Sequence, residues 1–77
     1  MPHVIIKLWS GRSEEVKQSL AEQIAKDVSE GLKVDQDHVS VAFEEVGKAD
    51  WCEQVYQPDM GDKGDQLYVK PNYEYES

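Results

Sequence analysis

The first apolar block, residues 3–9, has the pattern of a β-strand. Val4, Ile6 and Leu8 alternate along one side, and β-branched residues dominate the block. The intervening Ile5 is apolar as well. A strand that is apolar on both sides is typical of one buried on both faces.

A longer periodicity follows and predicts an amphipathic helix from residue 14 to about residue 30. Charged side chains cover much of the helix surface outside one apolar stripe. The apolar residues of that stripe fall four apart, at Val16, Leu20, Ile24 and Val28. Ser13 precedes the pattern and can cap the helix N-terminus, with Glu14 and Glu15 in the first turn. Gly31 is expected to end the helix.

Residues 38–46 predict a second strand, in which Val39, Val41 and Phe43 alternate with polar or small residues. Because a helix separates the two strands, they are expected to be parallel. Beyond Gly47 the pattern is weaker. It predicts a short helix over 49–56, a turn-rich segment over 58–65 and a short strand over 67–69.

These elements predict one α+β domain over residues 1–77, with a β-α-β core over 2–47 and a C-terminal extension over 48–77. A two-stranded sheet with one helix does not fold stably alone. A second copy of the chain is therefore expected to complete the sheet.

The composition is 39% hydrophobic and 31% charged, which is typical of a globular protein. A formal net charge of −8 disfavours nucleic acid and anionic membranes as partners. The sequence predicts no transmembrane helix and no signal peptide, and Cys52, as the sole cysteine, cannot form an internal disulfide. The expected location is the cytoplasm.

Charge is unevenly distributed along the chain. Residues 1–13 carry Lys7 and Arg12 and no acid, whereas all sixteen acids follow. A basic N-terminal region on an acidic protein is suited to drawing in an anionic small molecule.

Several chemistries lack their signatures in this sequence. It contains no glycine-rich phosphate loop and no Cys/His metal-binding spacing, so neither a metal nor a cofactor is expected. Nothing in the sequence brings Cys52 to either histidine. His3 is expected to be a hydrogen-bonded strand residue, and the alternative is that it orients the neighbouring Pro2 or donates to a bound substrate.

Pro2 is the candidate for proton transfer. Removal of Met1 would leave Pro2 with a secondary amine at the N-terminus, in place of an amide. An α-amino group titrates at about 7.7–8.0, and nearby positive charge or burial lowers its pKa further. A base with a pKa near the working pH suits proton transfer between carbon and oxygen. Lys7 is a candidate for that lowering, and equally for a solvent-facing edge residue.

The order of these features resembles the 4-oxalocrotonate tautomerase family. The matching features are Pro2, the apolar strand, the segment Gly11-Arg12-Ser13 opening a helix, and the second strand. The resemblance extends to the small bacterial tautomerases of the YdcE (PptA) type through further residues along the chain: His3, Lys7, Trp51, Val55-Tyr56, Pro58-Asp59, Leu67-Tyr68 and Lys70-Pro71-Asn72-Tyr73.

The resemblance implies a homo-oligomeric, cofactor-independent isomerase, with a dimer favoured over a hexamer. Pro2 would be the general base and then the general acid in keto–enol tautomerisation of small 2-oxo and 2-hydroxy acids. Arg12 would bind the substrate carboxylate, for which a guanidinium offers a bidentate fork. Trp51 stands where the family carries a phenylalanine in the pocket wall, although a core tryptophan is an equal alternative.

Ser40 departs from the founding members, which carry a second arginine at this position. A hydroxyl brings no charge, so the resemblance implies a monocarboxylic enol such as phenylenolpyruvate as the substrate. Two alternatives remain. One is a binding module with an idle pocket, and the other is a hydratase or dehalogenase, which would need Glu44 or Glu45 to activate water.

Overall fold

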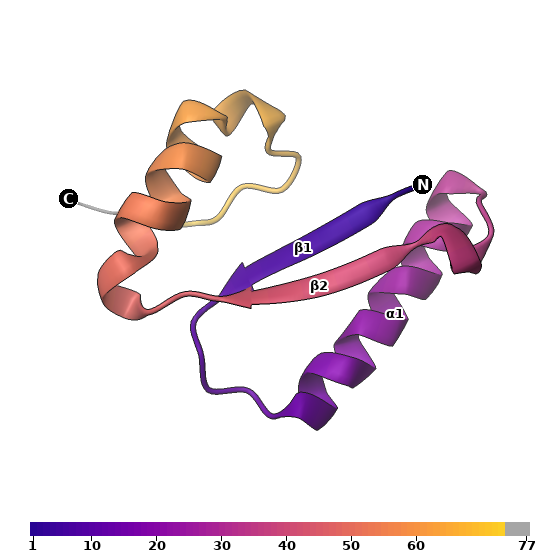
Figure 1. Cartoon of the computed structure of the whole chain (residues 1–77). Helices are drawn as coiled ribbons and strands as arrows, with labels where there is room; N and C mark the ends of the chain where they lie inside the picture. Colours follow the sequence, from indigo (N-terminus) through magenta and orange to yellow (C-terminus); the bar gives the residue numbers. More distant parts are fainter. Residues whose placement is uncertain (74–77) are drawn as a thin grey trace. The chain divides into compact units, whose positions relative to one another are not determined.

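The computed structural model describes residues 1–73. The chain divides into two compact units, Met1–Glu45 and Val46–Ser77, and each is considered by itself. The first unit contains β1 (His3–Leu8), α1 (Glu14–Leu32) and β2 (Ser40–Glu45), with a short 3₁₀ helix, η1 (Gln36–His38), before β2 (Figure 1).

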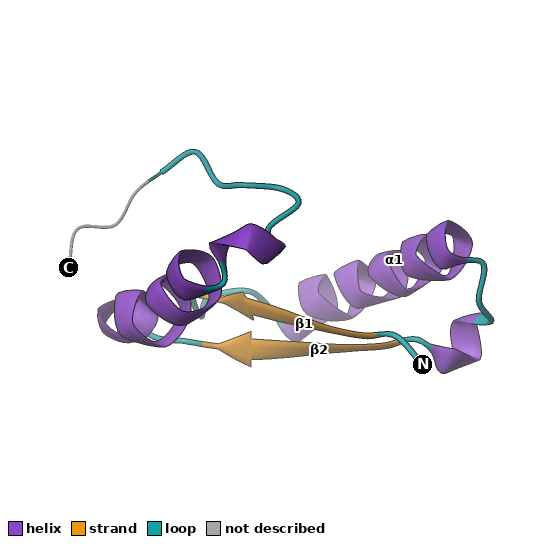
Figure 2. Ribbon diagram, turned by 90° about the horizontal axis from the view of Figure 1, so that it is seen from above, coloured by secondary structure: helices purple, strands orange, loops and turns teal. Residues whose placement is uncertain are grey.

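The two strands are parallel, and their register runs from His3 opposite Ser40 to Leu8 opposite Glu45. The helix α1 lies along one face of this two-stranded sheet (Figures 1 and 2). The predicted β-α-β unit with parallel strands is therefore confirmed. The second strand is shorter than expected, because residues 36–38 form the 3₁₀ turn and pairing begins only at Ser40.

Side-chain alternation divides the sheet into two faces. Val41 and Phe43 border the same groove as Ala21 of α1, and Lys17 of α1 reaches Glu45, so these β2 residues face the helix. The intervening β2 residues, and their β1 partners in the register, face away from α1: His3, Ile5, Lys7, Ser40, Ala42 and Glu44. The predicted alternation of Val41 and Phe43 against Ser40 and Glu44 is thus confirmed.

The ends of α1 follow one expectation and overturn another. The Ser13 side chain accepts a hydrogen bond of 3.2 Å from the Val16 amide, as predicted for the N-cap. Gly31 does not end the helix, which continues to Leu32. The chain leaves the helix at Lys33, which adopts the left-handed conformation with φ 58°.

The apolar stripe of α1 is only partly covered within the chain. Val16 is 52% and Leu20 is 45% exposed, whereas Ile24 and Val28 are half-buried. Residues four apart advance by about 40° around a helix of 3.6 residues per turn, so the beginning of the stripe rotates away from the sheet. Within Met1–Glu45 none of the described side chains is fully buried.

The second unit is helical. It contains η2 (Lys48–Asp50), η3 (Cys52–Asp62), which is a π-helix, and η4 (Gly64–Gln66). Its buried apolar side chains are Val46 and Val55, which are 8% and 4% exposed.

The structure corrects two expectations for this unit. The helix expected over 49–56 continues to Asp62, through the segment predicted to be turn-rich. The strand expected over 67–69 is absent, and Tyr68 and Val69 lie in a bend with exposed side chains. A strand requires a hydrogen-bonded neighbour, and strand pairing within residues 1–73 is confined to β1 and β2.

Candidate functional site

Pro2 lies directly before β1, at the end of the sheet where both strands begin. Its carbonyl oxygen accepts a hydrogen bond of 3.2 Å from the backbone amide of Ser40. Pro2 is half-buried, whereas Met1 before it is 95% exposed. Loss of Met1 would therefore remove almost no packing.

His3 and Ser40 form the side-chain pair nearest to Pro2 along the chain. They are partners in the parallel register, and His3 Nδ1 lies 2.6 Å from Ser40 Oγ, within hydrogen-bond distance. Both residues are exposed, on the face of the sheet that α1 leaves uncovered. The structure thus brings the backbone of Ser40 beside Pro2 and gives the His3 side chain a hydrogen-bonding partner.

Arg12 lies at the opposite end of β1 from Pro2, in the loop that leads to α1 (Figure 1). The six residues of β1 between them span about 20 Å at 3.3 Å per residue. Arg12 is exposed, and Gly11 before it has φ 127°, a conformation that L side chains rarely adopt. Pro2 and Arg12 of one chain are therefore not neighbours.

Lys7 is also distant from Pro2 within the chain. Five residues along β1 correspond to about 16 Å, which exceeds the screening length of about 8 Å at physiological salt. The register places Lys7 opposite Glu44 on the same face of the sheet. The segment that is free of acids in the sequence therefore has an acidic neighbour in the fold.

Lys17 holds the start of α1 against the end of β2. Its ammonium lies 2.9 Å from Glu14 Oε1 and 3.7 Å from Glu45 Oε1. The hydrogen bond to Glu14, together with the negative charge of both carboxylates, raises the pKa of Lys17 above its ordinary value, against a smaller opposing effect of burial. This cluster lies at the carboxyl end of the strands, away from Pro2.

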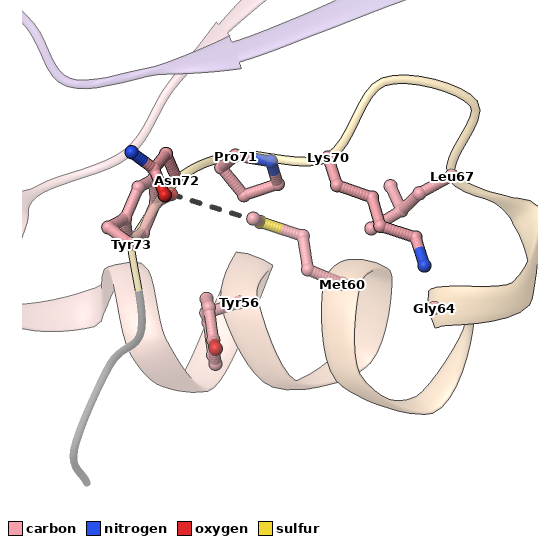
Figure 3. Close-up of a pocket in the computed structure, with 8 residues that line it drawn as sticks. All are labelled: Tyr56, Met60, Gly64, Leu67, Lys70, Pro71, Asn72 and Tyr73. Carbon is pink, nitrogen blue, oxygen red and sulfur yellow. Dashed lines mark hydrogen bonds between the residues drawn. The ribbon is translucent and has the colours of Figure 1, made fainter.

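Trp51 belongs to the second unit, where it is half-buried and directly precedes η3. The same unit carries a hollow of about 590 Å³ between η3 and the segment that follows η4 (Figure 3). The Tyr56 and Tyr73 rings lie 6.1 Å apart, and the Tyr73 hydroxyl lies 4.0 Å from Met60 Sδ. These contacts hold the later segment against η3.

The described residues, 1–73, contain no group of three or more His, Cys, Asp or Glu side chains placed to hold a metal ion. No helix within them has both the length and the apolar character needed to cross a membrane.

Comparison with known folds defines the structural class first. The chain is similar to a crystal structure of an apo, unfused 4-OT, with a TM-score of 0.61 and 20% sequence identity. The match covers 64% of this chain and 80% of that chain. At this identity the likeness establishes the β-α-β fold that both chains share.

Sequence comparison then identifies the family. A family profile described as "Tautomerase enzyme" matches residues 2–56. The chain is 44% identical to a probable tautomerase of Xylella fastidiosa (strain 9a5c) over 73 residues, 95% of this chain and 89% of that protein. It is 38% identical to tautomerase PptA of Enterobacter sp. (strain 638) over 74 residues, 95% of this chain and 97% of that protein.

The chain therefore belongs to the tautomerase family. Tautomerases are isomerases, so membership makes this protein an enzyme of the isomerase class. The family assignment expected from Pro2, the Gly11-Arg12-Ser13 segment and the β-α-β pattern is confirmed.

Proposed function

We propose that this protein catalyses keto–enol tautomerisation of small 2-oxo and 2-hydroxy monocarboxylic acids, with the nitrogen of Pro2 as the proton carrier. The observation that carries the proposal is the position of Pro2. It is fixed at the head of β1 by the Ser40 amide, and the Met1 that precedes it is 95% exposed. Family membership supplies the reaction class.

The proton path conserves every atom. A 2-hydroxy-2-enoic acid binds, and the neutral Pro2 nitrogen takes the proton of the enol hydroxyl as the C2 carbonyl forms. The resulting prolinium then delivers a proton to C3, which produces the 2-oxo acid and restores the free amine. A general base that becomes the general acid needs no other co-reactant.

The distance between Pro2 and Arg12 requires a second chain if Arg12 is to bind the substrate carboxylate. A twofold axis that pairs the free edges of two β1 strands makes those strands antiparallel. The beginning of one β1 then lies near the end of the other, which brings Pro2 of one subunit toward Arg12 and Lys7 of its partner. In this arrangement Lys7 can also lower the pKa of the Pro2 amine.

Exposed apolar surface supports such a homodimer. Ile5 in the middle of β1 is 52% exposed, and Leu32 at the end of α1 is 61% exposed. Each strand of the two-stranded sheet also has one edge outside the β1–β2 ladder. Paired β1 edges would form a four-stranded sheet and remove one open edge from each chain.

The proposed substrate is a monocarboxylate such as phenylenolpyruvate. Arg12 offers one cationic fork, and Ser40 beside Pro2 offers a neutral hydroxyl. Trp51 is the proposed aromatic contact for the aryl group. Within one chain the hydratase alternative gains no support, since Glu44 and Glu45 lie at the other end of β2 from Ser40. The sole cysteine keeps the cytoplasm as the proposed location.

The test compares two forms of one chain. The first begins at Pro2, as verified by intact mass, and the second carries one additional residue that leaves Pro2 nitrogen in an amide. The first form is expected to ketonise phenylenolpyruvate and the second to lose at least about 99% of kcat, because an amide nitrogen has no basic lone pair. Equal activity of the two forms would refute the role of Pro2.

A further inference from the structure

The hydrogen bond between His3 and Ser40 joins two exposed side chains at the head of the sheet. His3 Nδ1 and Ser40 Oγ are 2.6 Å apart, and the backbone of Ser40 is bonded to Pro2, the residue before His3. Water could satisfy both side chains, so a bond between them adds little to folding stability. The pair is better placed to act on a molecule bound beside Pro2.

The direction of this bond decides what the Ser40 hydroxyl can do, because that hydroxyl has one proton. If His3 Nδ1 accepts, the serine proton points to the ring and only lone pairs face outward. If Nδ1 carries a proton and donates, Ser40 Oγ accepts, and its own proton is available to a third group. The second arrangement makes Ser40 a donor directed away from His3.

We propose that His3 is a positioning residue that donates from Nδ1 to Ser40 and thereby directs the Ser40 hydroxyl at the substrate's C2 oxygen. The proposal rests on the tautomerase function above and identifies the group that bears the developing enolate charge. As Pro2 takes the enol proton, negative charge grows on the C2 oxygen, and the Ser40 O–H donates to it. The His3 bond polarises that donor, since hydrogen bonds in a chain strengthen one another.

The proposal also accounts for a neutral residue at position 40. A donor that is fixed before the reaction stabilises an oxyanion without reorganising during the step. His3 supplies that fixation from the adjacent strand, through the His3–Ser40 register. A serine held in this way performs a task for which a cationic side chain is not required.

The kinetic test uses His3→Leu, His3→Asn, Ser40→Ala and the double variant His3→Leu/Ser40→Ala, all beginning at Pro2. His3→Leu is expected to lower kcat by about tenfold with KM within about twofold, because the bond acts in the transition state. His3→Asn, whose amide can reach the position of Nδ1, is expected to recover kcat to within about threefold of the parent.

The double variant separates action through Ser40 from any other role. If His3 works through Ser40, His3→Leu/Ser40→Ala loses no more activity than Ser40→Ala alone. An additive loss, or a kcat for His3→Leu equal to that of the parent, would overturn the proposal while leaving the tautomerase function intact.

A measurement that is independent of turnover completes the test. The ¹⁵N NMR signals of the His3 ring are expected to show a proton on Nδ1 in the parent and a shift toward the Nε2 tautomer in Ser40→Ala. A parent with neutral His3 protonated only at Nε2 would overturn the proposal even in a preparation that lacks tautomerase activity. Absence of activity with Nδ1 protonated would instead count against the proposed function.

Discussion

The backbone amide of Ser40 donates to the carbonyl of Pro2 at 3.2 Å, so the first residue of β2 fixes the residue that precedes β1. The bond extends the parallel ladder by one step beyond the His3–Ser40 pair. A residue at a chain end is usually mobile unless it is tied down in this way. The ladder therefore fixes the backbone of Pro2 relative to the backbone of Ser40.

Subunit mixing tests whether Pro2 and Arg12 serve one site from different chains. Pro2→Ser with a retained N-terminal residue and Arg12→Glu are each expected to be nearly inactive as homodimers. After the two are unfolded and refolded together, about a quarter of parental activity is expected, because half of the dimers are mixed and each mixed dimer holds one intact site.

The control for mixing replaces Arg12→Glu with Lys26→Glu, a reversal at an exposed position on α1. That variant is expected to be active alone, with no extra gain on mixing. Native mass spectrometry verifies that mixed dimers form. If they form and the mixture of the Pro2 and Arg12 variants regains no activity, both residues serve a site within one subunit, which contradicts their separation along β1.

Arg12→Ala is expected to raise KM for phenylenolpyruvate by about tenfold or more while changing kcat by less than about threefold. The loss of a bidentate contact to a carboxylate removes binding that the substrate and the transition state share. Steady-state kinetics of Arg12→Ala and Arg12→Lys, compared with Lys26→Ala, measure the effect. An unchanged KM in Arg12→Ala would eliminate Arg12 as the carboxylate ligand.

Two substitutions at the end of α1 test where the helix terminates. Gly31→Ala is expected to stabilise the fold by about 0.5–1 kcal/mol, because Gly31 is helical and an added Cβ meets nothing within 4 Å. Lys33→Gly is expected to stabilise by a similar amount, since Lys33 has φ 58°. Urea unfolding measures both. Destabilisation by Gly31→Ala would mean that the helix ends at Gly31 after all.

Lys17 gives the stability a dependence on alkaline pH. Its pKa is raised above the ordinary value of 10.5, chiefly by the hydrogen bond to Glu14. The folded state therefore binds the Lys17 proton more tightly than the unfolded state, so this contribution is complete below pH 10.5 and disappears as pH rises through the higher folded value.

Melting curves of Lys17→Met and the parent test this dependence. The parent is expected to have the higher melting temperature at neutral pH. The difference in melting temperature between the parent and Lys17→Met is expected to narrow above about pH 10.5. Lys26→Met on the same helix serves as the matched control. If the difference in melting temperature between the parent and Lys17→Met is unchanged at about pH 11, the ion pairs of Lys17 are not its cause.

The Tyr56–Tyr73 contact is expected to hold the segment after η4 against η3. Tyr68 in that segment is fully exposed and offers a chymotrypsin site. An aromatic pair contributes about 0.5–1.5 kcal/mol, so Tyr73→Ala should speed cleavage after Tyr68 by about two- to tenfold, whereas Tyr73→Phe keeps the ring and most of the protection. Equal cleavage rates in Tyr73→Ala and the parent would show that the Tyr56–Tyr73 contact does not protect this segment from chymotrypsin.

Local patterns predicted the first unit well because each element carries its own signal. Ser13 caps α1 as expected, and the alternation of Val41 and Phe43 identifies the face of β2 that meets the helix. Gly31 misled the prediction, because glycine tolerates a helix interior while the left-handed residue two positions on, Lys33, has no distinctive sequence signature.

The site was less accessible to sequence reasoning. Pro2, Ser40 and Arg12 were predicted as one constellation, yet only Pro2 and Ser40 are neighbours in the chain, since strand length separates Arg12. The His3–Ser40 bond depends on strand register, which periodicity does not fix. The exposure of Ile5 on the open face of the sheet, 52%, is accounted for by the proposed second subunit.

The most direct measurement of the central claim is the turnover of phenylenolpyruvate by protein whose intact mass shows that it begins at Pro2, alongside the same chain with Pro2 nitrogen acylated by one retained residue. Ketonisation by the first form and its near-complete loss in the second, with unchanged circular dichroism, is the predicted result. Equal rates in both forms would contradict the claim that the Pro2 amine carries the proton.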